Sequence, residues 1–400
     1  MLNGLPCLSL CVKYHAMRLL TKIYITVVLL YGINAFAQDL NVLALVGKDK
    51  LGFINRSGKF IVKPSYDDAM PFKEGYAGVN KEGKWGYIND KGSMVIKPKF
   101  DAVSNFVDGV AAASLDGKWG FIDKSGEFII QPGFDYARPF KDGIARVRND
   151  RKWGFIDKQG NYIIEPKFSS ANDFNEGAAR VKAGRRWGFV DDKGKYIITP
   201  KFKSAGDFSD GLARVKHGRR WGYINKKGKF VISAKYASAN DFIEGMARVR
   251  SGGRMGFINK NGNYIISPQF GDAYDFVEDL SMVKAGGRWG YINKHGLYVI
   301  EPKYDWAWNF NEGLAAVSVA GKWGFINKAG EYVVEPKFDA VHDFSQGMVA
   351  VEIDGKWGFL DKTGANVIKP QFDVVSPFEK CSALDVMSTS IDDSEILVNG

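Results

Sequence analysis

A fixed period of 34 residues runs through most of the chain. The dipeptide Trp-Gly recurs at this interval in eight copies, and Leu51-Gly52 and Met255-Gly256 fill its place in two more, so ten copies follow one another without insertion or deletion. A repeat of this length is typical of solenoids, propellers and arrays, in which each unit buries its apolar face against its neighbours. The chain of 400 residues is therefore predicted to form one repeat structure rather than several separate domains.

Each copy has the residue pattern of three short strands. In the copy that begins at Trp153, the segment WGFID alternates as a strand does, and Gly160 ends the turn that follows it. The run NYII is a second strand, and Pro166 ends it because proline cannot donate to a sheet ladder. The segment AARV is a third strand. Since the sequence has no helical period, the prediction is an all-β fold of three-stranded antiparallel meanders.

The two ends of the repeat region, residues 51–387, differ from the other copies. Residues 38–50 include NVLALV, which matches the third strand of a missing copy, whereas the third strand of the last copy, CSALDVM, is weak. This pattern fits a closed propeller-like ring completed by its own N-terminal strand, and it fits a capped open array equally well. An open, superhelical, solenoid-like array is predicted, with the closed ring as the alternative, because ten three-stranded blades would be unusual for a propeller.

The repeated motif resembles a known family. The pattern KWGFIDKxGxYIIxPKF, followed by DFxEGxARV, is similar to the bacterial WG-containing repeat, or WG beta repeat, and the resemblance covers about residues 41–387. It implies β repeats, often in exported proteins. It carries no agreed catalytic residue or ligand, so the resemblance leaves the function open.

The N-terminal residues 1–37 have the pattern of a secretory signal peptide. Three basic residues precede an apolar run at 23–33, and Ala35 and Ala37 occupy the small-residue positions of a cleavage site. The run is shorter than the roughly 20 residues that span a bilayer. The mature chain is predicted to have no transmembrane segment and to be exported, as a periplasmic, cell-surface or secreted protein. Residues 388–400 are predicted to be a flexible acidic tail.

The residue types that catalysis requires are scattered. The mature histidines, His217, His295 and His342, occupy different repeat positions in different copies, and no nucleophile or metal-ligand motif occurs. The acidic motif DFxEG recurs from copy to copy, which fits turn capping better than acid–base work. We therefore expect no catalytic residue, no cofactor and no metal ion.

Charge distinguishes the middle copies. Residues 146–254 contain 25 basic and 11 acidic residues. In four successive third strands two cations lie two residues apart, on the face opposite the Ala/Val side. They are predicted to form a basic stripe for an acidic glycan or other anionic polymer of the cell envelope, or for a protein partner. The alternative is a solvated face that prevents sheet association. The predicted stripe consists of Arg146, Arg148, Arg180, Lys182, Arg214, Lys216, Arg248 and Arg250.

Two tryptophans lie outside the 34-residue register. Trp306 and Trp308 are two residues apart, so in an extended segment they would share a face. They are interpreted as a packing patch that compensates for Met255 or Asp279, or as an aromatic platform for a sugar or an apolar partner side chain. The tryptophans of the Trp-Gly motif are predicted to serve the core, because Leu51 and Met255 keep their bulk without the indole.

These features together predict an exported, non-catalytic β-repeat protein that binds or scaffolds a partner. A structural envelope spacer without a specific ligand is the alternative, and a glycan-active enzyme is the least favoured one. The features that differ between copies, rather than those that repeat, are expected to carry the function.

Overall fold

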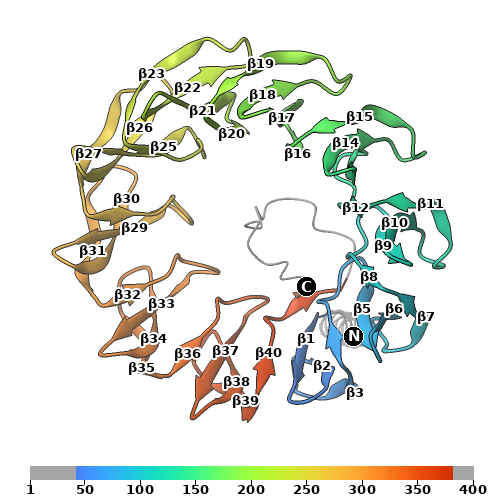
Figure 1. Ribbon diagram of the computed structural model, residues 1–400. Coiled ribbons are helices and arrows are strands. Elements are labelled where there is room, and N and C mark those ends of the chain that lie inside the picture. The colour runs from blue at the N-terminus through green and yellow to red at the C-terminus, as the bar shows by residue number, and fades with distance from the viewer. Residues whose placement is uncertain (1–41, 382–400) are drawn as a thin grey trace, which may run out of the picture.

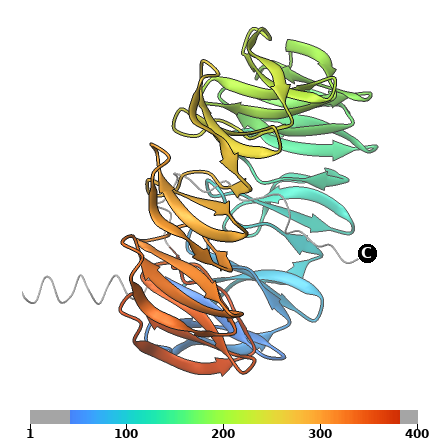
Figure 2. The ribbon, with the colours of Figure 1, turned by 90° about the vertical axis from the view of Figure 1, so that its left-hand side faces the viewer.

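The computed structural model describes residues 42–381, and these residues form β-strands without any helix. Nine four-stranded sheets and one five-stranded sheet make ten antiparallel blades. The blades are arranged in a ring (Figure 1), and each packs against the next around the ring when it is viewed from the side (Figure 2). The described chain is a ten-bladed β-propeller.

The blades share one strand order, which runs outward from the ring axis. The innermost strand of each blade is the inner strand, and the next is the second strand. The inner strands are β4 (Asp68–Ala69), β8 (Ala102–Val103), β12 (Tyr136–Ala137), β16 (Ser170–Asn175), β20 (Ser204–Ser209), β24 (Ser238–Ala239), β28 (Asp272–Ala273), β32 (Trp306–Ala307), β36 (Ala340–Val341) and β40 (Val374–Val375). The second strands are β1 (Val42–Gly47), β5 (Tyr76–Lys81), β9 (Ala111–Leu115), β13 (Ala145–Asn149), β17 (Ala178–Ala183), β21 (Leu212–His217), β25 (Met246–Ser251), β29 (Leu280–Ala285), β33 (Leu314–Val319) and β37 (Met348–Ile353).

The outer half of each blade consists of the WG strand, which carries the Trp-Gly position, and the outer strand. The WG strands are β2 (Leu51–Asn55), β6 (Lys84–Asn89), β10 (Lys118–Ile122), β14 (Lys152–Ile156), β18 (Arg186–Val190), β22 (Arg220–Asn225), β26 (Arg254–Asn259), β30 (Arg288–Asn293), β34 (Lys322–Asn327) and β38 (Lys356–Asp361). The outer strands are β3 (Phe60–Tyr66), β7 (Met94–Phe100), β11 (Phe128–Phe134), β15 (Tyr162–Phe168), β19 (Tyr196–Phe202), β23 (Phe230–Tyr236), β27 (Tyr264–Phe270), β31 (Tyr298–Tyr304), β35 (Tyr332–Phe338) and β39 (Asn366–Phe372). A short extra strand, β41 (Glu379–Lys380), belongs to the first blade.

The ring closes at the N-terminal strand. β1 pairs with β2 on one side and with β40 and β41 on the other, so the first blade contains strands from both ends of the described chain. Phe60 of the first blade contacts Phe372 of the last copy, with ring centroids 6.2 Å apart. The prediction of an open solenoid-like array is therefore wrong, and its alternative, the closed ring, is correct. The reason is that every blade takes its second strand from the preceding copy, and β1 supplies that strand to the first copy.

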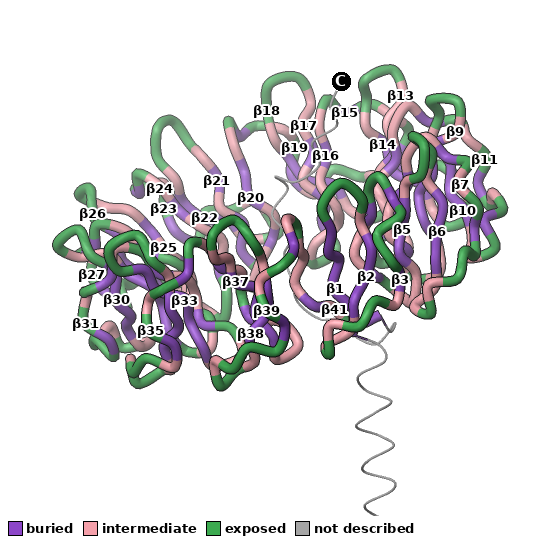
Figure 3. The backbone as a smooth tube through the Cα atoms, turned by 90° about the horizontal axis from the view of Figure 1, so that it is seen from below, coloured by how far each residue is buried: buried purple, intermediate pink, exposed green. Residues whose placement is uncertain are grey.

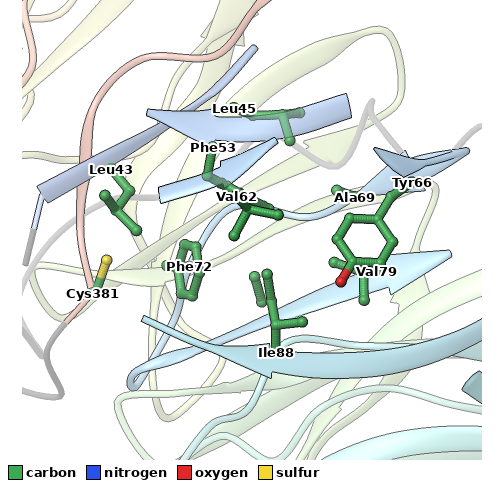
Figure 4. Close-up of a cluster of buried hydrophobic side chains, with 11 residues drawn as sticks. Leu43, Leu45, Phe53, Val62, Tyr66, Ala69, Phe72, Val79, Ile88 and Cys381 are labelled. Carbon is green, nitrogen blue, oxygen red and sulfur yellow. The ribbon is translucent and has the colours of Figure 1, made fainter. Parts of the chain in front are cut away.

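The core lies between blades rather than inside each one. Phe155 of one blade packs in one cluster with Ala179, Val181 and Val190 of the next. The cluster in Figure 4 has the same form, with Leu43 and Phe53 of the first blade packed near Ile88 of the second. Buried segments run through the strands, while exposed segments gather at the turns (Figure 3). Both faces of a blade are thus covered by its neighbours.

The glycine of the Trp-Gly motif is required by a close approach of two backbones. A Cβ atom on Gly154 would lie 2.5 Å from the Ile164 carbonyl oxygen and 2.7 Å from the Pro166 nitrogen. The pairing of β14 with β15 shifts register on both sides of Phe155, as a β-bulge does. The motif therefore marks a bulge at which the backbone of the outer strand lies so close to the WG strand that no side chain fits between them.

The predicted signal peptide, residues 1–37, and the predicted acidic tail, residues 388–400, lie outside the described residues. Within 42–381 no helix exists that could cross a membrane. Cys381 is a free, buried cysteine, and burial raises the pKa of its thiol to about 12.

Candidate anion-binding surface on one face of the ring

The ring has two different faces. The turns that join second strands to WG strands lie at one end of every blade, and we call this the hairpin face. The turns that follow the WG strands and the DFxEG loops lie at the other end, which we call the loop face, because the WG strand runs between the two ends. All ten blades have the same orientation, so each face presents a ring of equivalent turns.

Four of the predicted stripe residues connect neighbouring blades. Arg180 lies over the Trp187 ring, and its Nε lies 3.1 Å from Asp207 Oδ1 in the next blade. The Arg214 Nε has the same contact with Asp241 at 2.9 Å, and each arginine also donates to an alanine carbonyl 25 residues further along. The exposed fraction of the four arginine side chains at this position is 11–31%; they are Arg146, Arg180, Arg214 and Arg248. We call these ion pairs clamps; they are Arg146–Asp173, Arg180–Asp207, Arg214–Asp241 and Arg248–Asp275.

The clamps can be recognised in the sequence from paired differences between copies. Where the arginine position of one copy holds another residue, the aspartate position of the next copy also changes in every case but one, Asp343. The pairs without a clamp are Ala44 with Pro71, Gly78 with Asn105, Ala112 with Pro139, Met282 with Asn309, Ala316 with Asp343 and Ala350 with Pro377. This pairing indicates that the arginine and the aspartate serve one another, which supports a structural role for both.

Removal of a clamp arginine is expected to give a pH-dependent loss of stability. Burial raises the pKa of the Asp207 carboxyl, and the charge of Arg180 opposes that rise. In Arg180→Ala the pKa rises further, so the ionised carboxylate costs about 2 kcal/mol of unfolding free energy at pH 8. The loss shrinks as the pH falls through the raised pKa, because Asp207 of the folded variant then binds a proton and no longer carries an unpaired charge. Urea denaturation at pH 8 and pH 5 measures this difference.

The double variant Arg180→Ala/Asp207→Ala is the control for that measurement. It is compared with Asp207→Ala: neither variant has the carboxyl group, so the loss that Arg180→Ala causes in this background should be the same at both pH values. An equal loss at pH 8 and pH 5 in Arg180→Ala alone would show that Asp207 does not depend on the clamp.

The other four predicted stripe residues lie nearer the hairpin face and are half-buried. The Lys182 Nζ lies 5.6 Å from the Trp187 ring centroid, and the Lys216 Nζ lies 5.7 Å from that of Trp221. Arg148 lies against Trp153 in the same way, whereas Arg250 donates to the carbonyls of Gly253 and Gly271 and pairs with Asp272. The eight residues therefore lie in two layers: one of inter-blade clamps, and one nearer the hairpin face in which three cations lie over motif tryptophans and Arg250 pairs with Asp272.

A second kind of ion pair occurs on the hairpin face, which we call the latch. Just before the Trp-Gly position, a lysine or arginine pairs with the aspartate that follows the outer strand; the Lys84 Nζ lies 2.6 Å from Asp101 Oδ1. Asp101 also accepts the Gly117 backbone N–H, and these hydrogen bonds, first that of Lys84, lower the pKa of its carboxyl. The latches are Lys50–Asp67, Lys84–Asp101, Lys118–Asp135, Arg288–Asp305, Lys322–Asp339 and Lys356–Asp373.

Four adjacent blades lack the acidic half of the latch. The aspartate is replaced by Ser169, Lys203, Ala237 and Gly271, and the cations that it would neutralise are Lys152, Arg186, Arg220 and Arg254. These four cations are exposed, and within residues 42–381 no carboxylate lies at ion-pair distance from them. Further exposed cations lie in the same turns. We call the set the basic sector; it consists of Arg151, Lys152, Arg185, Arg186, Lys203, Arg219, Arg220 and Arg254.

The basic sector lies in the copies that carry the excess of basic residues, but none of its residues belongs to the predicted stripe. The signal was present at the end of the outer strand, which reads PSYD, PKFD, PGFD, PKYD or PQFD wherever a latch forms and PKFS, PKFK, AKYA or PQFG in the four middle copies. Its meaning depends on the fold, because the two partners of a latch are 17 residues apart, one at the start of the WG strand and the other just after the outer strand.

The comparison with protein families agrees with the blade structure. The pattern of the WG containing repeat matches ten segments of the chain: residues 52–85, 85–119, 119–153, 153–184, 187–220, 221–254, 255–289, 289–323, 323–357 and 357–381. The chain belongs to this family. The resemblance expected from the sequence is thereby confirmed. A search of curated proteins finds no match.

Solved structures show only distant likeness to the WG-repeat ring. A eukaryotic initiation factor has a TM-score of 0.47 and 8% identity, covering 73% of this chain and 94% of that chain. A dihydro-heme d1 dehydrogenase has a TM-score of 0.41 and 12% identity, covering 86% and 76%. Hsv2p of Kluyveromyces lactis has a TM-score of 0.36 and 10% identity, covering 59% and 96%. With every score below 0.5, these likenesses carry no argument about function.

Trp306 and Trp308 of the WG-repeat ring contact different partners. Trp308 packs against Trp323 of its own blade, with ring centroids 5.4 Å apart. Trp306 stacks on Trp289 of the preceding blade at 6.4 Å and remains 58% exposed. The two indoles therefore do not act as one platform: Trp308 packs against a core cluster, and Trp306 is left at the surface.

Acidic residues of the DFxEG loops are engaged in the structure of the WG-repeat ring. Besides the aspartates of the clamps, Glu176 accepts the Gly211 backbone N–H of the next blade, as Glu278 does that of Gly313. In the described part of the chain, no three His, Cys, Asp or Glu side chains are grouped so that they could hold a metal ion.

Proposed function

We propose that this WG-repeat protein is a non-catalytic scaffold that binds an anionic polymer through the basic sector. The observation that carries the proposal is the loss of the latch aspartate in four adjacent blades, which leaves Lys152, Arg186, Arg220 and Arg254 exposed without a carboxylate partner. A surface that only needed solubility would keep the paired charges of the other six blades. A row of unpaired cations instead attracts a polyanion and gains free energy by releasing its counterions.

A non-catalytic role is supported by the contacts of the acidic motif DFxEG, which recurs from copy to copy. Four of the five aspartates at this position of the motif form clamps, and Glu176 and Glu278 accept backbone N–H groups of the next blade, so these carboxylates are occupied in holding blades together. Catalysis needs a positioned acid, base or nucleophile beside a substrate, and a group committed to an inter-blade ion pair is not available for it. The ring thus serves as a rigid frame for a charged surface.

We also propose that the protein is exported. The signal-peptide pattern of residues 1–37 supports this location, and the polymer would then be an acidic component of the cell envelope. A structural spacer without a ligand is the competing function, and it does not require the sector of unpaired cations.

The binding of the mature chain to long-chain polyphosphate, measured over a range of salt concentrations, tests the proposal. If about four to eight phosphates are contacted, the logarithm of the affinity should fall with the logarithm of salt concentration with a slope of about −3 to −6. Absence of binding at low salt to polyphosphate, to an acidic polysaccharide and to single-stranded DNA would overturn the proposal and favour the spacer.

A further inference from the structure

An exposed aromatic site lies beside the basic sector. Arg254, the last member of the sector, lies in the blade of β24–β27, and the next blade around the ring contains Lys284 and Trp289. Trp306 of the following blade stacks on Trp289 with an angle of 27° between the ring planes. The aromatic site and the sector are therefore one blade apart (Figure 1).

The aromatic site has a buried indole at its centre. Trp289 is 3% exposed and lies between two exposed rings, Trp306 and Tyr274, which are 58% and 42% exposed. The Tyr274 centroid is 5.7 Å from that of Trp289. The Lys284 Nζ lies 5.4 Å from the Trp289 centroid and 5.5 Å from the Trp306 centroid. The cluster thus fixes the exposed Trp306 ring against a rigid base.

Packing accounts for only one side of Trp306. Its stacked side helps to cover Trp289, but more than half of the side chain stays in water, where folding gains nothing from a large apolar ring. The same position at the start of the inner strand holds serine in three of the four neighbouring copies towards the N-terminus. A ring that is rigidly held, exposed and not demanded by the fold is a feature of binding surfaces.

The surroundings of Trp306 favour a sugar over a nucleic acid. Asp272 pairs across the strands with Lys284, and its side chain is 46% exposed. Its carboxylate pairs with Arg250 and can still accept hydrogen bonds from sugar hydroxyls, as can the carboxylate of the neighbouring latch aspartate, Asp305, which pairs with Arg288. The apolar face of a pyranose ring can stack on the indole while its hydroxyls donate to these carboxylates, whereas a phosphodiester has no hydrogen to donate to them.

We propose that Trp306 stacks a sugar ring of an acidic polysaccharide whose charged groups lie on the basic sector. This inference rests on the proposed function, and it narrows the anionic polymer to an acidic polysaccharide. The basic sector supplies charge and length dependence, and Trp306 with Lys284 and Asp272 selects the sugar. A polyanion without sugar rings uses the basic sector alone.

The test compares three probes of similar charge on the full mature chain: an oligo-uronate, polyphosphate and an oligodeoxythymidylate. In Trp306→Ala the affinity for the oligo-uronate is expected to fall at least tenfold, while the affinity for polyphosphate changes less than twofold. Trp306→Tyr, which keeps an aromatic ring, is expected to recover part of the loss. The control is Leu297→Ala, which removes a 65% exposed apolar side chain on the loop face and should leave all three affinities unchanged.

The outcomes separate the two proposals. If polyphosphate binds but Trp306→Ala leaves the oligo-uronate affinity within twofold of the wild type, the sugar site is wrong and the basic sector stands. If the oligodeoxythymidylate binds more tightly than the oligo-uronate and depends on Trp306, the ligand class is wrong. If no probe binds the wild type, the proposed function itself falls.

Discussion

The variant Val46→Asp is expected to lower the free energy of unfolding by about 4 kcal/mol or more. Val46 is fully buried, and it pairs with Gly52 of β2 on one side and Val375 of β40 on the other. Its side chain belongs to the cluster that joins the first blade to Phe359 and Phe372 of the last. A carboxylate at this position has no cation to pair with in that cluster, so the blade that closes the ring is destabilised first.

Urea denaturation and small-angle scattering measure the two consequences of Val46→Asp. The midpoint of unfolding should fall, and the radius of gyration should rise under conditions in which the wild type is still compact. Lys48→Asp is the control, because Lys48 lies two residues further along and is exposed. If Val46→Asp kept wild-type stability and dimensions, β1 would not close the ring.

Much of the fold could be predicted from the sequence because the signals are local. The period, the strand alternation and the turn glycines each depend on neighbouring residues, and they predicted ten β units correctly. The inner strand was missed because in most copies it has only two residues, as in β12. Ring closure was left open because NVLALV shows only that β1 can act as a second strand. It does not show which strand will pair with its other edge.

The basic stripe shows why a surface is harder to predict than a strand. Alternation with Ala and Val shows correctly that Arg180 and Lys182 share a face, but in a propeller both faces of a blade are covered. Arg180 therefore reaches the next blade instead of solvent. The exposed charges lie at the turns. Lys84 pairs with an aspartate 17 residues further along, whereas the same position after Arg186 and Arg220 holds Lys203 and Ala237.

Restoring the missing latches is expected to weaken polyanion binding without weakening the fold. The variant Ser169→Asp/Lys203→Asp/Ala237→Asp introduces a carboxylate in three blades, at the position equivalent to Asp101. The new carboxylates lie opposite Lys152, Arg186 and Arg220 respectively. Lys152, Arg186 and Arg220 remain but are neutralised, Lys203 is removed, and the net charge falls by four. Affinity for polyphosphate should fall at least about 30-fold at low salt, because several phosphate contacts are lost. Each new pair should change the unfolding free energy by no more than about 1 kcal/mol, in the stabilising direction.

A matched variant separates the position of the charge from its amount. Gln159→Asp/Lys193→Asp/Asn261→Asp makes the same change of net charge at exposed turns of the loop face, in the same part of the ring. The most direct measurement is therefore the polyphosphate affinity of these two variants and the wild type at one low salt concentration. The account predicts a large loss in the latch variant and at most a threefold loss in the loop-face variant. Equal losses in both, or an unchanged affinity in the latch variant, would contradict the assignment of binding to the basic sector.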